Sequence, residues 1–242
     1  MTAGKEGSRG TPRVAVLVPA LNEEEALPGL LASLPEEVDL VVVADNGSTD
    51  RTPELARAAG ALVVHEPERG YGAACLAALG VLEDRLDGCD VVVFVDADQT
   101  VEPGSLRSLV EPVRNGRADL VLGARTDPGR GVGTLMPHAR LGNRLVLGLA
   151  RLLFGQRYRD SGPFRAIRWD ALGRLEMDDR NWGWTLQMQL RAGLRGLRVL
   201  EVDVPHRSRA QGRSKITGSL RTSLKVGLKM FYTLARERLR AR

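Results

Sequence analysis

The segment 91–100, which reads Val-Val-Val-Phe-Val-Asp-Ala-Asp-Gln-Thr, constrains the fold of this chain most strongly. Its uninterrupted run of Val and Phe predicts a strand buried on both faces, because no polar residue alternates with them to mark a wet side. The run ends in Asp96 and Asp98. Ligands bind at the carboxyl ends of strands in open α/β sheets, and two neighbouring acids repel unless a cation or a proton lies between them. The pair therefore suggests a divalent metal ion, with an Asp-rich turn as the plain alternative.

Length and composition predict one large α/β domain. At 242 residues the chain can bury a sizeable core, and its 43% hydrophobic and 27% charged residues are ordinary for a soluble globular protein. The two cysteines have no metal-ligand spacing and the N-terminus has no secretory pattern, so we expect a cytoplasmic location. No apolar run approaches the ~20 residues that cross a bilayer, and any membrane contact is therefore expected to be peripheral, at the inner face of the cell membrane.

Charge is distributed unevenly along the chain. Residues 206–242 hold eleven Lys or Arg and one acid, a net charge of +10, whereas the whole chain has a net charge of +5. A basic tail behind a mildly acidic body suggests an anionic partner, which can be nucleic acid, a membrane surface or a phosphorylated substrate. The tail has too few aromatic residues for a base-stacking platform, so we expect no nucleic-acid partner.

Strand and helix patterns alternate along the chain, which predicts a mostly parallel sheet of βαβ units flanked by helices. We expect strands at 14–18, 38–44, 61–65, 90–95, 119–122, 164–168 and 197–204. We expect helices at 23–34, 53–59, 73–86, 103–115, 140–154, 184–192 and 219–240, with a Gly- and Pro-rich loop at 123–137.

The same patterns divide the chain into three parts. Residues 1–12 are predicted to be disordered, and 13–217 to form a single domain with a nucleotide-binding part, 13–122, and an acceptor part, 123–217. Residues 218–242 are expected to form a basic amphipathic helix, which can pack on its own domain or lie in a membrane interface.

Two further loops are expected at the same edge of the sheet as Asp96 and Asp98. The first, 19–24, reads Pro-Ala-Leu-Asn-Glu-Glu, and the second, 45–50, reads Asp-Asn-Gly-Ser-Thr-Asp. Their acids can accept hydrogen bonds from a ribose hydroxyl or a base N–H. A third stretch, Arg-Gly-Tyr-Gly at 69–72, precedes a helix, and its glycines permit close backbone approach or tight helix packing.

The order of these motifs resembles that of the family 2 nucleotide-sugar glycosyltransferases, which implies a glycosyltransferase A-type fold. Further motifs are similar to the dolichyl- and polyprenyl-phosphate mannosyl- or glucosyltransferase branch. They are Asp-Ser-Gly-Pro-Phe-Arg at 160–165, Gly-Trp-Thr-Leu-Gln-Met at 183–188 and Gly-Arg-Ser-Lys at 212–215. The resemblance covers about residues 14–218, and although each motif is weak alone, their shared order is a strong signal.

The resemblance assigns roles to individual residues. It implies that a UDP- or GDP-sugar donor is held by Pro19, Ala20, Asn22, Glu23, Asp45, Gly47, Gly70, Asp96 and Ala97. It implies that Asp96 and Asp98 hold a Mg or Mn ion, with Asp98 as the chief ligand. It implies phosphate-binding roles for Arg125, Arg140 and Arg144 toward the acceptor and for Arg207, Arg213 and Lys215 toward the donor. The branch has a Gln two residues after the second Asp, but here Gln99 comes one residue early, so the third metal ligand is open.

The sequence leaves the acceptor open. Inverting transfer to a hydroxyl needs a carboxylate base, whereas a phosphate acceptor is already an anion and needs none. The related branch has Gln-Met-Glu where this chain has Gln-Met-Gln at 187–189, so a base would have to come from Asp160, Asp178 or Asp179. Three hypotheses follow: a metal-dependent inverting hexosyltransferase acting on polyprenyl phosphate, a soluble enzyme acting on a hydroxyl of a small molecule or glycan, and a non-catalytic nucleotide-sugar-binding module. The donor base and oligomeric state stay unassigned.

Overall fold

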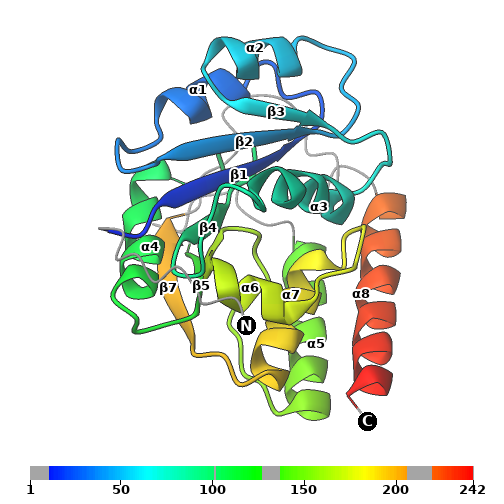
Figure 1. Cartoon of the computed structure of the whole chain (residues 1–242). Coiled ribbons are helices and arrows are strands. Elements are labelled where there is room, and N and C mark those ends of the chain that lie inside the picture. Colours follow the sequence, from blue (N-terminus) through cyan, green and yellow to red (C-terminus); the bar gives the residue numbers. More distant parts are fainter. Residues whose placement is uncertain (1–10, 101, 127–136, 206–219, 242) are drawn as a thin grey trace, which may run out of the picture.

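The computed structural model describes residues 11–100, 102–126, 137–205 and 220–241, with side chains from 141 onward in the fifth helix and from 225 onward in the last (Figure 1). Within these residues the chain forms a seven-stranded sheet in the order β3-β2-β1-β4-β6-β5-β7. The strands are β1 (Val14–Ala20), β2 (Leu40–Asp45), β3 (Leu62–His65), β4 (Val91–Phe94), β5 (Leu120–Thr126), β6 (Arg165–Arg168) and β7 (Val199–Pro205). Strand β6 runs antiparallel to β4 and β5, and the other pairs are parallel, which confirms the predicted mixed α/β class with a mostly parallel sheet.

Helices cover both faces of the sheet. They are α1 (Leu27–Ala32), α2 (Thr52–Ala58), α3 (Tyr71–Leu82), η1 (Pro103–Ser105), α4 (Leu106–Arg114), α5 (Pro137–Phe154), α6 (Trp169–Leu175), α7 (Trp184–Leu194) and α8 (Leu220–Arg240). One core joins the sheet to α1, α2 and α4, and a second joins its other face to α3, α6 and α7. Helices α5 and α8 lie side by side and form a third core with α7 (Figure 1).

The central strand is buried on both faces, as the sequence predicts. Val91, Val92, Val93 and Phe94 are all 0% exposed, because β4 lies between β1 and β6 and beneath both helical layers. The unbroken apolar run is therefore explained by the position of the strand at the centre of the sheet.

The structure differs from the prediction at several element boundaries and in one additional helix. Helix α1 begins at Leu27 rather than at residue 23, because the Glu23 and Glu24 N–H groups bond to Thr52 Oγ1 and Asp50 Oδ2 instead of entering a helix. Strand β5 continues to Thr126, since it pairs with β7 along its whole length, so the loop expected from residue 123 begins later. Helix α6, seven residues long, was not predicted; it follows β6 directly.

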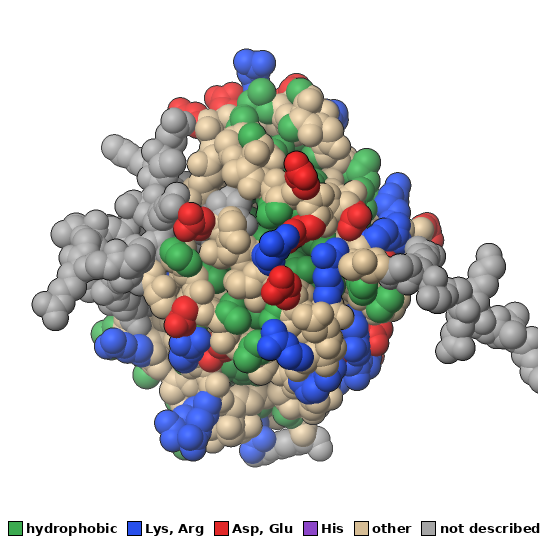
Figure 2. All heavy atoms as spheres, turned by 90° about the vertical axis from the view of Figure 1, so that its left-hand side faces the viewer, with side chains coloured by type: hydrophobic (Ala, Val, Ile, Leu, Met, Phe, Trp, Pro, Cys, Tyr) green, Lys and Arg blue, Asp and Glu red, His purple; other side chains and the backbone are tan. Residues whose placement is uncertain are grey.

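The face that carries α4 and β7 shows acidic and basic side chains interspersed rather than separated by sign (Figure 2). Helix α4 and strand β7 contribute to ion pairs, among them Arg107 with Glu37 at 2.8 Å and Arg159 with Asp203 at 2.6 Å. Among the helices that the structure describes, none has both the length and the apolar character to cross a bilayer.

Candidate functional site

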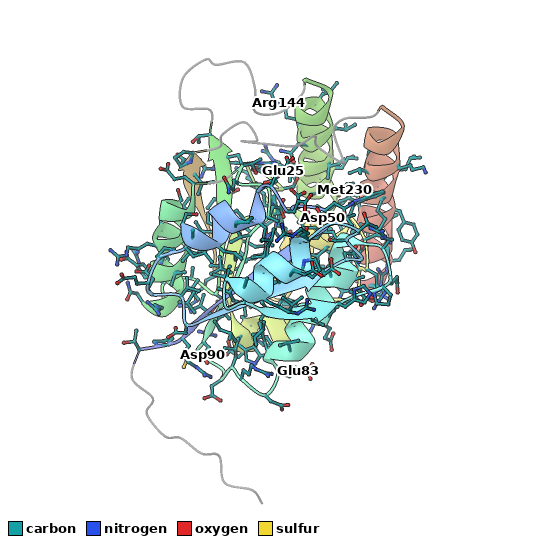
Figure 3. The ribbon with its side chains drawn as sticks, turned by 90° about the horizontal axis from the view of Figure 1, so that it is seen from above. Glu25, Asp50, Glu83, Asp90, Arg144 and Met230 are labelled. Carbon is teal, nitrogen blue, oxygen red and sulfur yellow. The ribbon has the colours of Figure 1, made fainter. Side chains whose placement is uncertain are left out.

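The carboxyl ends of the strands gather the loops that the sequence singles out. Figure 3 shows Glu25 and Asp50 on the side of the sheet toward Arg144 of α5 and Met230 of α8, with Asp90 at the opposite end. Because β1, β2 and β4 are parallel neighbours, the loops that follow them meet at one edge. Helix α5 thus flanks the edge where a ligand is expected.

The loops after β1 and β2 are fastened to each other. Asn22 donates its N–H to Ser48 Oγ (2.9 Å) and accepts the Thr49 N–H on its side-chain oxygen (2.7 Å). Pro19 and Ala20 end β1 in register with Ala44 and Asp45, and Ala20 is 3% exposed. The residues predicted to hold a nucleoside are therefore brought together, and Asn22 holds the second loop with its side chain.

Asp45 is a nearly buried carboxylate at the end of β2. It is 4% exposed, accepts the Ser48 backbone N–H at 2.9 Å and lies 2.9 Å from His65 Nδ1 on β3. Burial raises the pKa of Asp45, but the contacts with Ser48 and His65 outweigh it and leave the pKa below its ordinary value. Asp45 is thus an ionised acceptor, as recognition of a base N–H requires.

The segment before α3 is held by packing and by Asn46. The Asn46 amide donates to the Glu66 and Glu68 carbonyls, and its oxygen accepts the Gly70 N–H at 2.8 Å. A Cβ added to Gly70 would overlap the Arg180 carbonyl oxygen, and one added to Gly72 would overlap that of Asp179. Close packing against residues 179–180 accounts for both glycines; nucleotide binding by Gly70 stays a prediction.

Gly47 lies in the loop that follows β2. Its φ is +77°, a left-handed conformation that side chains disfavour, and the Arg69 guanidinium lies 3.6 Å from where its Cβ would be. The position therefore favours glycine because of its backbone conformation, and a Cβ would be in ordinary contact with Arg69.

Asp96 and Asp98 follow β4 at the centre of this edge. Asp98 Oδ1 accepts the Thr100 N–H at 3.1 Å and the Thr100 hydroxyl at 2.8 Å. Gln99 has a left-handed backbone, with φ at 55°, and its amide donates to the Ala26 carbonyl at 2.5 Å. The side chain of Gln99 is therefore directed to the start of α1 rather than to a shared ligand set with Asp98.

Asp96 and Asp98 have the chemistry of a cation site, although the part of the chain that the structure describes gives them no full set of protein ligands. Within the described residues no group of three or more His, Cys, Asp or Glu is placed to hold a metal ion. Two carboxylates nevertheless suit Mg²⁺, which is commonly bound by one or two carboxylates while substrate phosphates and waters complete its shell. The donor set fits an ion that arrives with a diphosphate, and its binding here stays a prediction.

Arg125, on β5, pairs with Asp160 and lies within electrostatic range of Asp96 and Asp98. Its Nε and Nη2 donate to the two oxygens of Asp160 at 2.7 and 2.8 Å, and its backbone N–H donates to Asp160 Oδ2 at 3.1 Å. Burial lowers the pKa of Arg125, but the charges of Asp160, Asp96 and Asp98 raise it above the ordinary value. Arg125 is thus a fixed cation within the field of both carboxylates.

Asp160 is engaged as an ion-pair partner. It is 7% exposed, and besides Arg125 it accepts the Asn143 amide at 3.1 Å and the Ser161 N–H at 2.8 Å. Burial raises its pKa, but the contacts with Arg125 hold it below the ordinary value. This environment suits a group that orients Arg125. It is unfavourable for a group that must take up a proton.

A buried polar cluster lies near Asp96. Arg165 is 0% exposed and donates to the main-chain carbonyls of residues 162, 163 and 185, and burial lowers its pKa to about 10. Burial and the charge of Asp96 raise the pKa values of Tyr71 and Cys75 well above their ordinary values. Arg165 therefore stabilises the 160–165 turn and supplies a positive charge near the carboxylate.

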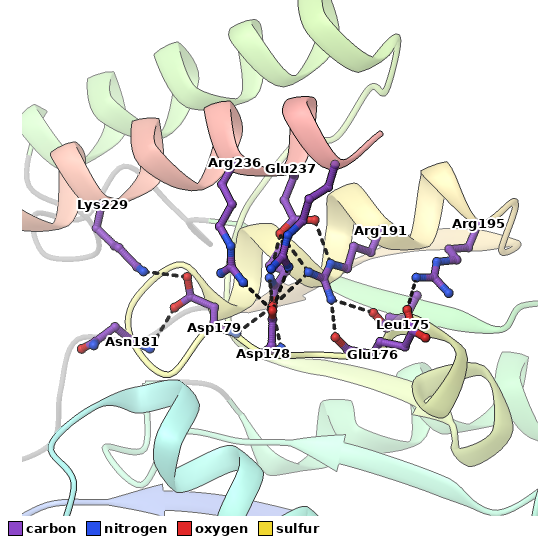
Figure 4. Close-up of polar contacts among 12 residues, drawn as sticks. Leu175, Glu176, Asp178, Asp179, Asn181, Arg191, Arg195, Lys229, Arg236 and Glu237 are labelled. Carbon is purple, nitrogen blue, oxygen red and sulfur yellow. Dashed lines mark hydrogen bonds and ion pairs between the residues drawn. The ribbon is translucent and has the colours of Figure 1, made fainter. Parts of the chain in front are cut away.

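The other candidate bases belong to the attachment of α8 (Figure 4). Asp178 pairs with Arg191, Arg236 and Arg240, and its pKa is lowered to about 2 because these contacts outweigh its burial. Asp179 is 1% exposed, with Lys229 Nζ at 2.8 Å. Gln189, at the position where the related branch has Glu, is 0% exposed and donates to the Asp160 carbonyl at 2.8 Å.

The remaining predicted residues divide into two groups. Glu23 follows Asn22 in the loop after β1, Ala97 is 3% exposed between the two acids, and Arg144 is exposed on α5 (Figure 3). The side chains of Arg140, Arg207, Arg213 and Lys215 lie outside the described residues, so their roles stay predictions.

Asn46, His65, Asn143 and the role of Arg165 could not be predicted from the sequence. The 160–165 motif pointed to Arg165, but nothing in the sequence indicates that it bonds to carbonyls rather than to an acid. The partners of Asn143 and His65 are 17 to 20 residues away and meet them only in the folded chain.

Comparison with known proteins identifies a matching family and several similar proteins. Residues 15–176 match the glycosyl transferase family 2 description. The chain is 40% identical over 212 residues to an uncharacterized glycosyltransferase of Mycobacterium tuberculosis, covering 87% of this chain and 93% of that protein. It is 34% identical over 253 residues to the undecaprenyl-phosphate mannosyltransferase of Micrococcus luteus, covering 95% of this chain and 98% of that protein.

A solved structure shares the fold. Glucosyl-3-phosphoglycerate synthase from Mycobacterium tuberculosis, in complex with Mn²⁺, UDP and glucosyl-3-phosphoglycerate, superposes with a TM-score of 0.74 at 26% identity. The match covers 92% of this chain and 78% of that chain. The family match covers more than half of the chain and includes both carboxylates and the three loops at the edge of the sheet. The chain belongs to glycosyl transferase family 2 and resembles its dolichyl- and polyprenyl-phosphate branch.

Proposed function

We propose that this protein is a metal-dependent, inverting hexosyltransferase that moves a hexose from a UDP- or GDP-sugar to a polyprenyl phosphate. The observation that carries the proposal is Arg125, a cation fixed by Asp160 and exposed to the charges of Asp96 and Asp98. It lies at the edge where donor and acceptor would meet. The relatedness to a protein named undecaprenyl-phosphate mannosyltransferase supports a lipid-phosphate acceptor.

The environment of the acids favours an anionic acceptor over a hydroxyl. Asp160, Asp178 and Asp179, the three candidate bases, are each ion-paired, and the first two have lowered pKa values. A phosphate oxygen is already charged at neutral pH and attacks without a base. Arg125 would bind that phosphate and orient it, because a guanidinium matches phosphate oxygens well.

On the donor side, Asp45 would accept a hydrogen bond from the nucleobase and Asp96 one from the ribose. Asp98, with Asp96, would hold the divalent ion. When bound, Mg or Mn would neutralise the charge that develops on the leaving diphosphate. The buried carboxylate of Asp45 is compatible with both UDP- and GDP-sugars as donors, since each base offers an N–H.

The test is transfer from radiolabelled UDP- and GDP-hexoses to undecaprenyl phosphate in detergent, with Mn²⁺, Mg²⁺ or EDTA. We expect a glycolipid product that EDTA abolishes and that Asp98→Asn reduces by at least about a hundredfold. Asp84→Asn, on the exposed segment after α3, is the charge-matched control and is expected to retain activity. Product with a sugar hydroxyl but none with the lipid phosphate would contradict the proposal, and tight donor binding without any transfer would favour a binding module.

We also propose that α5 and α8 contact a membrane surface, where a lipid-linked acceptor resides. Large apolar side chains are exposed on both helices, namely Leu141, Leu145 and Leu152 on α5 and Leu228, Phe231, Tyr232 and Leu239 on α8. Exposed basic residues accompany them, among them Arg144, Arg151 and Lys225. Apolar residues with flanking cations are the composition of helices that lie in an anionic interface.

A further inference from the structure

Asn143 connects the α5 helix to the ion pair at the site. Its amide nitrogen donates to Asp160 Oδ1 at 3.1 Å, and its amide oxygen accepts the Ser161 hydroxyl. The amide nitrogen and the amide oxygen of Asn143 thus bind two consecutive residues of the 160–165 turn. An amide that merely filled space would not need this arrangement.

Asp160 in turn is held entirely by directed contacts. Oδ1 accepts from Arg125 Nη2, Asn143 and the Ser161 N–H, while Oδ2 accepts from Arg125 Nε and the Arg125 backbone N–H. A Cβ at Gly162 would lie 3.0 Å from Asp160 Oδ2 and 3.1 Å from Arg125 Nε, so glycine leaves room for the pair. The plane of the carboxylate is thus set by all five donors together.

Arg125 depends on that orientation. Its side chain is 18% exposed, and both of its described donor contacts to side chains go to Asp160. A bidentate guanidinium–carboxylate pair fixes the plane of the guanidinium, and with it the direction of the remaining N–H groups. A carboxylate tilted by the loss of one donor would tilt the guanidinium as well.

We propose that Asn143 is a positioning residue that acts on the reaction through Asp160 and Arg125. It fixes the plane of the Asp160 carboxylate, and the carboxylate fixes the Arg125 guanidinium toward the acceptor phosphate. This inference rests on the proposed function, since it assigns Arg125 to a phosphate acceptor. Because Asn143 belongs to α5, it also ties the orientation of Arg125 to the helix that carries exposed apolar residues.

The first test measures lipid-phosphate transfer by Asn143→Ala and Asn143→Asp. We expect kcat to fall about tenfold in Asn143→Ala, with the donor KM unchanged, because one hydrogen bond to a charged group is lost. Asn143→Asp has the same shape but cannot donate to Asp160 and adds a like charge, so it should be impaired at least as strongly. Near-normal kcat in Asn143→Ala would overturn the proposal, because it would show that the reaction does not need the hydrogen bond to Asp160.

The second test asks whether Asn143 acts through Arg125. In an Arg125→Lys background, which already breaks the bidentate pair, adding Asn143→Ala should lower kcat no further. If the two losses multiply, Asn143 does not act through Arg125. Gln156→Ala is the structural control. Gln156 lies just after the end of α5, and its amide donates to the Leu190 carbonyl at 2.9 Å. Loss of this bond should reduce stability without changing kcat.

A third readout is independent of transfer. The ¹⁵Nε–¹Hε signal of Arg125, assigned by its loss in Arg125→Lys, should be protected from solvent exchange in the unliganded wild type. In Asn143→Ala the exchange should be about tenfold faster, while in Gln156→Ala it should not change. If the wild type makes no glycolipid, the proposed function fails, and this measurement still decides whether Asn143 positions Arg125. Unchanged exchange in Asn143→Ala would refute the positioning.

Discussion

At the scale of single residues, glycines at the start of α3 allow two distant segments to meet. Gly72 is buried against the Asp179 carbonyl, and the N–H of the next residue, Ala73, donates to the Arg180 carbonyl at 2.9 Å. A backbone donor at the first turn of a helix has no partner within the helix, so residues 179–180 satisfy one here. The contact fixes α3 against the loop that leads into α7.

Gly72→Ala is therefore expected to destabilise the protein by about 1–3 kcal/mol, because its Cβ would displace the backbone of Asp179. Gly80→Ala is a matched control on the same helix, where a Cβ would meet nothing within 4 Å. It should stabilise by about 0.5–1 kcal/mol through helix propensity. Urea unfolding of both variants measures the difference; equal midpoints would contradict this account of the motif at 69–72.

At the scale of elements, α8 is attached by buried charges as well as by apolar packing (Figure 4). Glu237 is 2% exposed and accepts from Arg191 Nε at 2.8 Å and from the Gln187 amide at 2.8 Å. Arg191 also pairs with Asp178 at 2.9 Å, so one network spans α7, the loop before it and α8. A basic helix is thereby held to an otherwise mildly acidic body.

Removing a buried member of this network should lower the free energy of unfolding more than removing an exposed member. Glu237→Ala leaves the buried Arg191 with less compensation, and we expect a loss of about 3 kcal/mol in the free energy of unfolding. Arg240→Ala, whose side chain is 50% exposed, should change it by less than about 1 kcal/mol. Chemical denaturation of both variants provides the comparison, and a loss below about 1 kcal/mol in Glu237→Ala would contradict a stabilising role of the buried network.

At the scale of the whole molecule, the edge of the sheet that gathers the carboxylates lies beside the helices that expose apolar residues (Figure 3). An enzyme acting on a lipid phosphate needs this juxtaposition, since the acceptor head group stays at the membrane surface. The exposed residues of α5 and α8 account for most of the large apolar side chains that the described part of the chain leaves in solvent.

We expect the protein to sediment with phosphatidylglycerol vesicles. Changing Leu141 and Leu228 together to Glu should lower the partition coefficient by more than about tenfold, since each buried Leu contributes ~1.5 kcal/mol or more. Leu200→Glu, on β7 and 40% exposed, is the control of equal chemistry and should bind normally. Binding that survives the double change, or falls equally in the control, would refute contact through α5 and α8.

The alternation of apolar runs and amphipathic segments determined much by itself: the class of fold, the buried central strand, and the placement of Asp96, Asp98 and Asp45 at strand ends. These features follow from local periodicity and from the rule that parallel strands share a carboxyl edge. The order of the motifs also indicated the family. The full length of β5 escaped prediction because it depends on pairing with β7, which no local pattern reveals, and the seven-residue helix α6 was not predicted either.

Only the tertiary structure decided the roles of the charged groups. Asp160 reads as a base in sequence, but folding places it against Arg125 and Asn143, and Asp178 against the arginines of α8. Gln99 follows the metal-site acids in sequence, yet a left-handed backbone turns it toward Ala26. Periodicity specifies which face of an element is buried, whereas the partner of a carboxylate is set by residues far along the chain.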